Sequence, residues 1–140
     1  MIKDIVKDTA FLSQKSARIE NVKDEVQLAT DLIDTYNQYK ERCVGLAAPQ
    51  IGVLKRAVLI APPNMTPFVM FNPAILGRSP RTYIATEGCM SLDGKRDVKR
   101  HEWVKVAYTD SKNKSVMKTY SGLVAEIIQH EVDHLNGVLI

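Results

Sequence analysis

The sequence predicts an α+β domain in which antiparallel and mixed strands pack around a C-terminal helix, with a long helix near the N-terminus. Three observations favour this class. Apolar residues recur at helical spacing over residues 24–42, short apolar runs fill the middle of the chain, and a second helical pattern closes it. A chain of 140 residues can build one hydrophobic core but not two, so residues 1–140 are expected to form a single domain.

The predicted elements follow from local patterns. In the helix over residues 24–42, one face collects Val26, Ala29, Leu32, Ile33, Tyr36 and Tyr39. Residues 56–61 and 68–72 are short apolar runs typical of strands, and the Pro62-Pro63-Asn64 sequence between them indicates a turn. Residues 102–110 alternate in polarity, and residues 115–120 follow after a polar tip, which predicts a hairpin. Ser121 is a candidate N-cap and Gly137 a candidate C-cap for the last helix.

Composition narrows the function classes. The 19 basic and 16 acidic residues are scattered, and only residues 94–101 are locally basic. A nucleic-acid groove usually needs denser charge with interleaved aromatics, so this stretch is expected to be a solvated face or a rim that steers substrate. No apolar stretch suits a signal peptide or a membrane span, and two cysteines make no disulfide framework. A cytoplasmic protein with free thiols is the expectation.

Two of the three histidines, His130 and His134, lie one helical turn apart in the last predicted helix. Residues four apart share a helix face, so both imidazoles can point at one ion. Glu131 lies beside His130 and can reach a water on that ion without being a ligand. The spacing therefore predicts a metal site with a nearby general base, because a pair of unrelated histidines rarely encloses such a glutamate.

A catalytic metal site usually has three protein ligands and one open position, so a third ligand is needed. Cys89 is the best candidate, because glycine precedes it and a Ser-Leu-Asp-Gly stretch follows soon after, which lets the backbone approach an ion. His101 and Cys43 are the rivals. His101 adjoins a predicted strand and has the character of a surface residue.

Three segments, taken in order, resemble the peptide deformylase family. They are CVGLAAPQIG (43–52), EGCMS (87–91) and QHEVDHLNG (129–137). The family pattern is Gly-x-Gly-Leu-Ala-Ala-x-Gln, then Glu-Gly-Cys-Leu-Ser, then Gln-His-Glu-x-Asp-His-Leu-x-Gly. The likeness spans most of the chain. It implies a hydrolase that removes the formyl group from the N-terminal formyl-methionine of new bacterial polypeptides.

The resemblance also implies residue roles. Cys89, His130 and His134 would hold one divalent metal, typically Fe(II), with zinc, nickel or cobalt as substitutes. Glu131 would act as general base, while the Gln50 amide and the backbone N–H of Met90 would hold the oxyanion. Such an enzyme would meet formylated nascent peptides, with a transient ribosome contact, as a monomer that binds neither membrane nor specific nucleic acid.

Substrate contacts are also carried over from the family. Val44, Leu123 and Ile127 match positions that line a methionine pocket, and Gly45 would offer its backbone to the peptide. Asp133 would pair with an arginine before a strand, for which Arg100 is the candidate here. Arg96 is a weaker candidate for steering the peptide.

The chain departs from the family pattern at several positions. Cys43 replaces the first glycine of the first motif, so a thiol is expected at the cleft edge, where it would be exposed to oxidants. Glu126 occupies a position that is often apolar, and Met90 replaces leucine. These departures leave two alternatives open: a paralogue with weak or altered activity, and a metallopeptidase with the His-Glu-x-x-His pattern. The second is disfavoured because its third ligand usually comes from a later residue.

Overall fold

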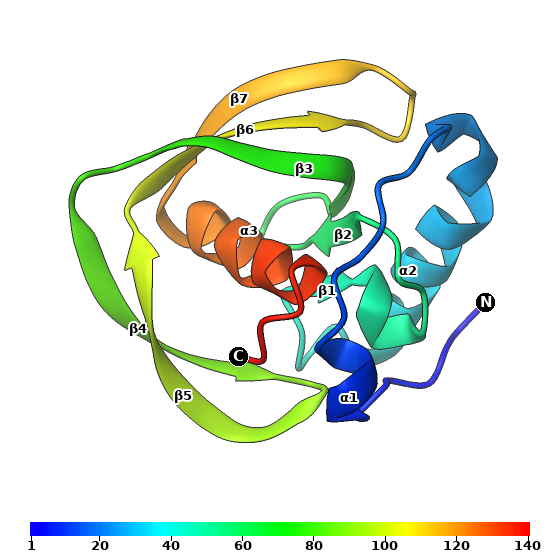
Figure 1. Cartoon of the computed structure of the whole chain (residues 1–140), viewed down its shortest axis with the longest axis horizontal. Helices are drawn as coiled ribbons and strands as arrows, with labels where there is room; N and C mark the ends of the chain where they lie inside the picture. Colours follow the sequence, from blue (N-terminus) through cyan, green and yellow to red (C-terminus); the bar gives the residue numbers. More distant parts are fainter.

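The computed structural model describes all 140 residues, Met1–Ile140, which form two β-sheets and three α-helices (Figure 1). The helices are α1 (Thr9–Leu12), α2 (Val26–Tyr39) and α3 (Gly122–Leu135), with 3-10 helices η1 (Val22–Glu25) and η2 (Ala48–Ile51). The strands are β1 (Gly45–Ala47), β2 (Ala57–Ile60), β3 (Phe68–Arg78), β4 (Thr82–Cys89), β5 (Leu92–His101), β6 (Trp103–Thr109) and β7 (Ser115–Ser121). None of the helices combines the length and the apolar character needed to cross a membrane.

The larger sheet has the strand order β1-β2-β3-β6-β7, and every neighbouring pair is antiparallel. Alternate side chains of β2 enter two apolar clusters, one on each face of the sheet, because successive residues point to opposite faces. Leu59 packs in a cluster with Leu32 of α2, whereas Ile60 packs in a cluster with Ile128 of α3. The strand is thus buried on both faces, and α3 is fixed against the sheet by apolar packing.

Strands β4 and β5 form a separate antiparallel ribbon that curves around α3 (Figure 1). The sequence patterns above do not predict it, because its polarity is inverted. Ile84 is 67% exposed, while Glu87 and Arg100 are buried. An alternation that places charged residues inside does not match the apolar-in pattern by which strands are recognised. The basic stretch over residues 94–101 is strand β5, in which Lys95 and Lys99 are exposed.

Three further expectations need correction. The predicted "mixed" sheet is wrong: both sheets are wholly antiparallel, and the one parallel contact is an isolated bridge between Ala17 and Lys55. The helix predicted over residues 24–42 spans only Val26–Tyr39, because residues 22–25 form η1, and the first helix of the chain is the short α1. The strand predicted over residues 68–72 continues to Arg78 through Pro73, where the register with β6 shifts. Such an irregularity tolerates a proline inside a sheet.

Candidate metal centre and active site

Helix α3 places His130 and His134 on one face, one turn apart. Apolar side chains on its other faces, among them Ile128 and Leu135, are buried in the core. Both imidazoles are buried as well, and their Nε2 atoms lie 3.1 Å apart. Packing therefore fixes the two rings in a geometry in which both ring nitrogens point at the same place.

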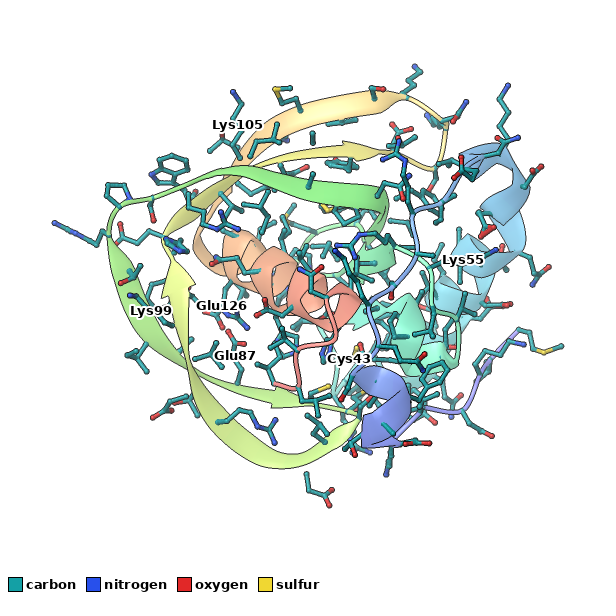
Figure 2. The ribbon with its side chains drawn as sticks, in the orientation of Figure 1. Cys43, Lys55, Glu87, Lys99, Lys105 and Glu126 are labelled. Carbon is teal, nitrogen blue, oxygen red and sulfur yellow. The ribbon has the colours of Figure 1, made fainter.

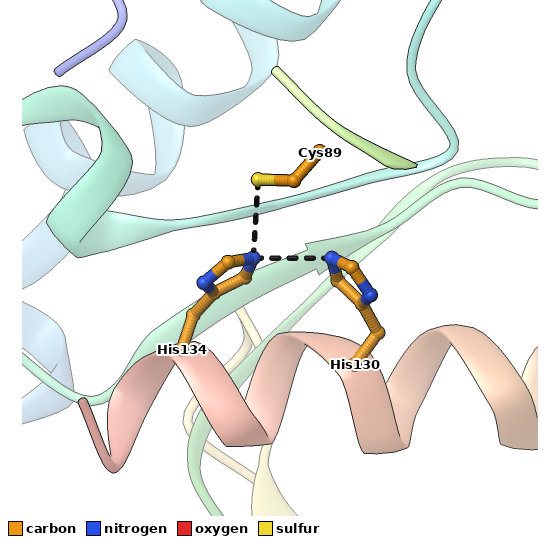
Figure 3. A group of neighbouring side chains, drawn as sticks. All are labelled: Cys89, His130 and His134. Atoms are coloured by element: carbon orange, nitrogen blue, oxygen red, sulfur yellow. Dashed lines mark hydrogen bonds between the residues drawn. The ribbon is translucent and has the colours of Figure 1, made fainter. Parts of the chain in front are cut away.

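Cys89 joins the two histidines from the end of β4 (Figure 3). Its Sγ lies 3.4 Å from Nε2 of His134, and the three potential ligand atoms all lie within 4.8 Å of one another. In a tetrahedral site with ordinary metal–nitrogen and metal–sulfur bonds, neighbouring ligand atoms are about 3.3–3.6 Å apart. The distances of 3.1 Å between the two Nε2 atoms and 3.4 Å between Sγ and Nε2 of His134 are close to this spacing, and one thiol with two imidazoles is a donor set that suits a divalent transition metal. The residues present therefore fit such an ion.

The pKa values of the two histidines are shifted in opposite directions. Burial lowers the pKa of His134 to about 3, so its imidazole is neutral, which is the form that binds metal. Burial also acts to lower the pKa of His130, but hydrogen bonds with Cys89 and Glu87 raise it to about 10. A divalent cation at this place would compete with that proton, as metal binding to imidazole generally does.

Glu131 follows His130 on α3, and its carboxyl group has an unsatisfied hydrogen-bonding atom. Its Oε1 atom is buried and has no hydrogen-bond partner. Burial raises the pKa of Glu131 to about 7. A Cβ at Gly45 would lie 2.7 Å from the Oε2 atom of Glu131 and 2.9 Å from Ile127. Position 45 therefore accommodates the packed glutamate only as glycine, which is a different reason from the backbone contact with peptide expected from the sequence.

The side-chain amide of Gln50, which lies on η2, points toward the sulfur of Cys89. Its Oε1 accepts a hydrogen bond from the backbone N–H of Ala47 at 2.9 Å, which orients the amide. Its Nε2 then lies 3.2 Å from Sγ of Cys89 and 3.3 Å from Oγ of Ser91. Sequence reasoning alone reads Gln50 as a turn residue, but the fold turns its amide donors toward the thiol.

A buried ionic network supports the histidine pair. Arg100 donates to both carboxylate oxygens of Glu87, at 2.9 and 2.7 Å, and to Asp133 at 2.6 Å. The predicted pairing of Asp133 with Arg100 is confirmed. Glu87 also hydrogen-bonds Nδ1 of His130 at 2.8 Å, which fixes the ring so that Nε2 faces the ligand cluster.

Glu87 is the residue that sequence reasoning did not assign. It lies within the second motif, two residues before Cys89. A strand places residues i and i+2 on one face, so the position of Glu87 relative to Cys89 was the available signal. This spacing is informative only if residues 82–89 are recognised as a strand. The inverted polarity of that segment hides the strand from the sequence pattern.

A cavity of about 510 Å³ opens beside this cluster. Four residues of the candidate site line it: Cys89, Met90, His130 and Glu131. The three expected pocket residues also line it: Val44, Leu123 and Ile127. Ile127 is buried, whereas Val44 and Leu123 are 43% and 49% exposed, so these two are not ordinary core residues.

The two rival ligands do not join the cluster. His101 contacts the carbonyl oxygen of Ser79 through Nδ1 at 2.8 Å. Cys43 lines the cavity, but the residue is only 8% exposed and its thiol donates to the carbonyl oxygen of Gly45 at 2.8 Å. Burial raises the pKa of Cys43 to about 12. The expectation of an exposed, oxidisable thiol at the cleft edge is therefore wrong, because the side chain turns inward under the strand.

Comparison with known proteins gives a consistent result. The family model described as polypeptide deformylase matches residues 2–140. A peptide deformylase of Clostridium beijerinckii is 44% identical over 140 residues, covering the whole of both chains. One from a Picosynechococcus species is 40% identical over 134 residues, which covers 91% of this chain and 71% of that protein. The K1U-bound crystal structure of class I type b peptide deformylase from Acinetobacter baumannii superposes with a TM-score of 0.92 at 36% identity, covering 99% of this chain and 97% of that one.

Proposed function

This chain belongs to the polypeptide deformylase family, and we propose that residues 1–140 act as one catalytic domain that removes the formyl group from formyl-methionine at the N-terminus of new polypeptides. It is a metal-dependent hydrolase. The observation that carries the residue assignment is the convergence of one thiol and two imidazoles beside a buried carboxyl group with an unpartnered oxygen.

Cys89, His130 and His134 would hold the metal, with Fe(II) as the ion in the cell and zinc, nickel or cobalt as substitutes. A divalent ion at this place would lower the pKa of water and polarise a carbonyl oxygen. Glu87 supports the site through Nδ1 of His130, since its hydrogen bond leaves Nε2 as the ligand atom.

Glu131 serves as the general base. Its pKa of about 7 matches a group that must both take and return a proton near neutral pH. The carboxylate takes the proton of the attacking water at the unpartnered oxygen and returns it to the nitrogen of the departing amine. The neighbouring Gly45 leaves the space that this carboxyl group occupies.

Gln50 and the backbone N–H of Met90 donate to the oxygen that gains negative charge when water attacks the formyl carbon. The amide of Gln50 is held by Ala47, so no reorganisation of that donor is needed during the reaction. The side chain of the formylated residue packs on Val44, Leu123 and Ile127, and Gly45 passes its backbone along the peptide. Formylated nascent peptides are the partners, met in the cytoplasm by a monomer in transient contact with the ribosome.

The test is hydrolysis of formyl-Met-Ala-Ser by protein purified without oxygen and loaded with Fe(II) or Ni(II), with metal content measured on the same sample. Release of formate at one metal ion per chain supports the proposal. The unformylated peptide Met-Ala-Ser is the matched control, because a metallopeptidase would cleave it. A metal-loaded protein that releases no formate would be a deformylase-like paralogue, and the proposal would fail.

A further inference from the structure

One face of α3 lines the cavity with a stripe of four side chains. Leu123, Glu126, Ile127 and His130 all border the cavity, and they are spaced at i, i+3, i+4 and i+7. Residues at these spacings lie next to one another on a helix surface. A substrate side chain that packs on Leu123 and Ile127 therefore lies beside Glu126, whose carboxyl group interrupts an otherwise apolar wall.

The carboxyl group of Glu126 is held in place without a cationic partner. The hydroxyl of Tyr83 donates to its Oε1 at 2.9 Å, and no basic side chain lies within ion-pair distance of it. Glu87 is drawn near Glu126, between α3 and the β4–β5 ribbon, in Figure 2. In contrast to Glu126, Glu87 is ion-paired with Arg100 and hydrogen-bonded to His130. Glu126 thus brings to the cavity wall a carboxyl group that has a hydrogen bond but no ion-pair partner.

We propose that Glu126 is a specificity-determining residue, which lets the cavity take a formylated residue with an unbranched side chain that ends in a hydrogen-bond donor or a positive charge. The inference rests on the proposed function, since it places the first side chain of a formyl-peptide on the α3 stripe. A lysine side chain has the required form: its methylene stem packs on Leu123 and Ile127, and its ammonium group meets the carboxylate. Methionine shares the unbranched stem and is accepted through the apolar contacts alone.

The experiment compares two substrates that differ only at the tip of the first side chain. Formyl-norleucine-Ala-Ser keeps an unbranched four-carbon side chain, and formyl-Lys-Ala-Ser adds the ammonium group. The measured quantity is the ratio of kcat/KM for the lysine peptide to that for the norleucine peptide, with the Ni(II)-loaded enzyme.

In Glu126→Gln this ratio is expected to fall about fivefold, the size of a partly exposed ion pair. This variant keeps the shape of the side chain and an oxygen for Tyr83, so a loss of fold is not expected. Tyr83→Phe should lower the ratio by less, because the carboxylate stays but is no longer held. Glu41→Gln is the matched control, since Glu41 lines the same cavity from the segment after α2 and carries the same charge.

Formyl-Met-Ala-Ser is the reference that separates two kinds of failure. If the loaded enzyme hydrolyses no formyl-peptide, the proposed function fails. If it hydrolyses formyl-Met-Ala-Ser but the ratio in Glu126→Gln stays within about twofold of the wild-type ratio, the role of Glu126 is overturned. An equal fall in Glu41→Gln also overturns it, because the effect would then arise from the charge of the cavity as a whole.

Discussion

Replacing Glu87 with glutamine should weaken both the fold and the metal site, because three hydrogen bonds converge on this carboxylate. Two come from Arg100 and one joins it to Nδ1 of His130. The side chains of Glu87 and Arg100 are only 7% and 4% exposed. A glutamine offers one acceptor oxygen, and in either orientation its NH₂ group faces an N–H of Arg100, donor against donor.

The magnitude follows from burial. Breaking a buried ion pair costs about 3–5 kcal/mol. Arg100 keeps Asp133, whose side chain is 31% exposed, so we expect the lower end, about 3 kcal/mol, or roughly 10 °C in Tm for a domain of this size. Loss of the group that orients a histidine ligand typically lowers metal affinity about 10- to 100-fold.

Thermal unfolding with excess chelator measures the first effect, and competition with a chelator of known affinity measures the second. Glu102→Gln is the control, since Glu102 is exposed and forms no ion pair. A variant whose Tm lies within about 2 °C of wild type and whose affinity lies within about threefold would refute the reasoning.

The same carboxylate predicts a pH dependence. Burial acts to raise the pKa of Glu87, but hydrogen bonds with His130 and Arg100 lower it from 4.5 to about 2. A lowered pKa in the folded state stabilises the protein fully above the unfolded value of 4.5, and this stabilisation is lost as the pH falls toward 2. The stability difference between wild type and Glu87→Gln, measured with chelator present, should therefore narrow between these two values.

Further substitutions test other residues of the site. Glu131→Gln should keep the metal, measured by elemental analysis, and lose most turnover, since an amide cannot accept a proton from water; loss of metal and turnover together would contradict the role of base. Gly45→Ala should unfold at lower temperature and turn over more slowly, because the new Cβ would lie 2.7 Å from Glu131, whereas Gly77→Ala, whose Cβ would meet no atom closer than 3.6 Å, controls for the lost glycine. Cys43→Ala should leave the peroxide sensitivity of the nickel-loaded enzyme unchanged, because this thiol is buried with a raised pKa; slower inactivation would show that Cys43 is exposed in solution.

The sequence could predict the site residues that lie on α3, but not the residues of the β4–β5 ribbon that contact them. His130, Glu131 and His134 are constrained by helical periodicity alone, since α3 follows from local pattern and its spacing sets one face. The contact that brings Cys89 of β4 to α3 is not encoded in local pattern, so only its glycine-flanked position and the family resemblance favour it over His101 and Cys43. The structure brings its sulfur to the two histidines, with all three potential ligand atoms within 4.8 Å of one another.

Burial was the property hardest to predict. Cys43 was expected at the cleft edge, and it does line the cavity, but the direction of its thiol depends on the carbonyl of Gly45 and on packing against α2. Ile84 and Arg100 show the opposite exposure from that suggested by their polarity. The partners that allow Arg100 to be buried, Glu87 and Asp133, lie on other elements, so the periodicity of one strand cannot indicate that this charge is buried.

The different anchoring of α3 and the ribbon explains why so many polar residues surround the candidate metal ligands Cys89, His130 and His134. Helix α3 is held by apolar packing against the five-stranded sheet. The β4–β5 ribbon, which supplies Cys89, is tied to α3 by polar contacts, among them Arg100 to Asp133 and the paired bonds between Gln129 and the backbone of His101. Hydrogen bonds are directional, so they set the position of a strand relative to a helix more narrowly than apolar contacts do. The distance between Cys89 and the histidine pair therefore depends on this polar network, and a change there affects the ligand geometry without touching a ligand.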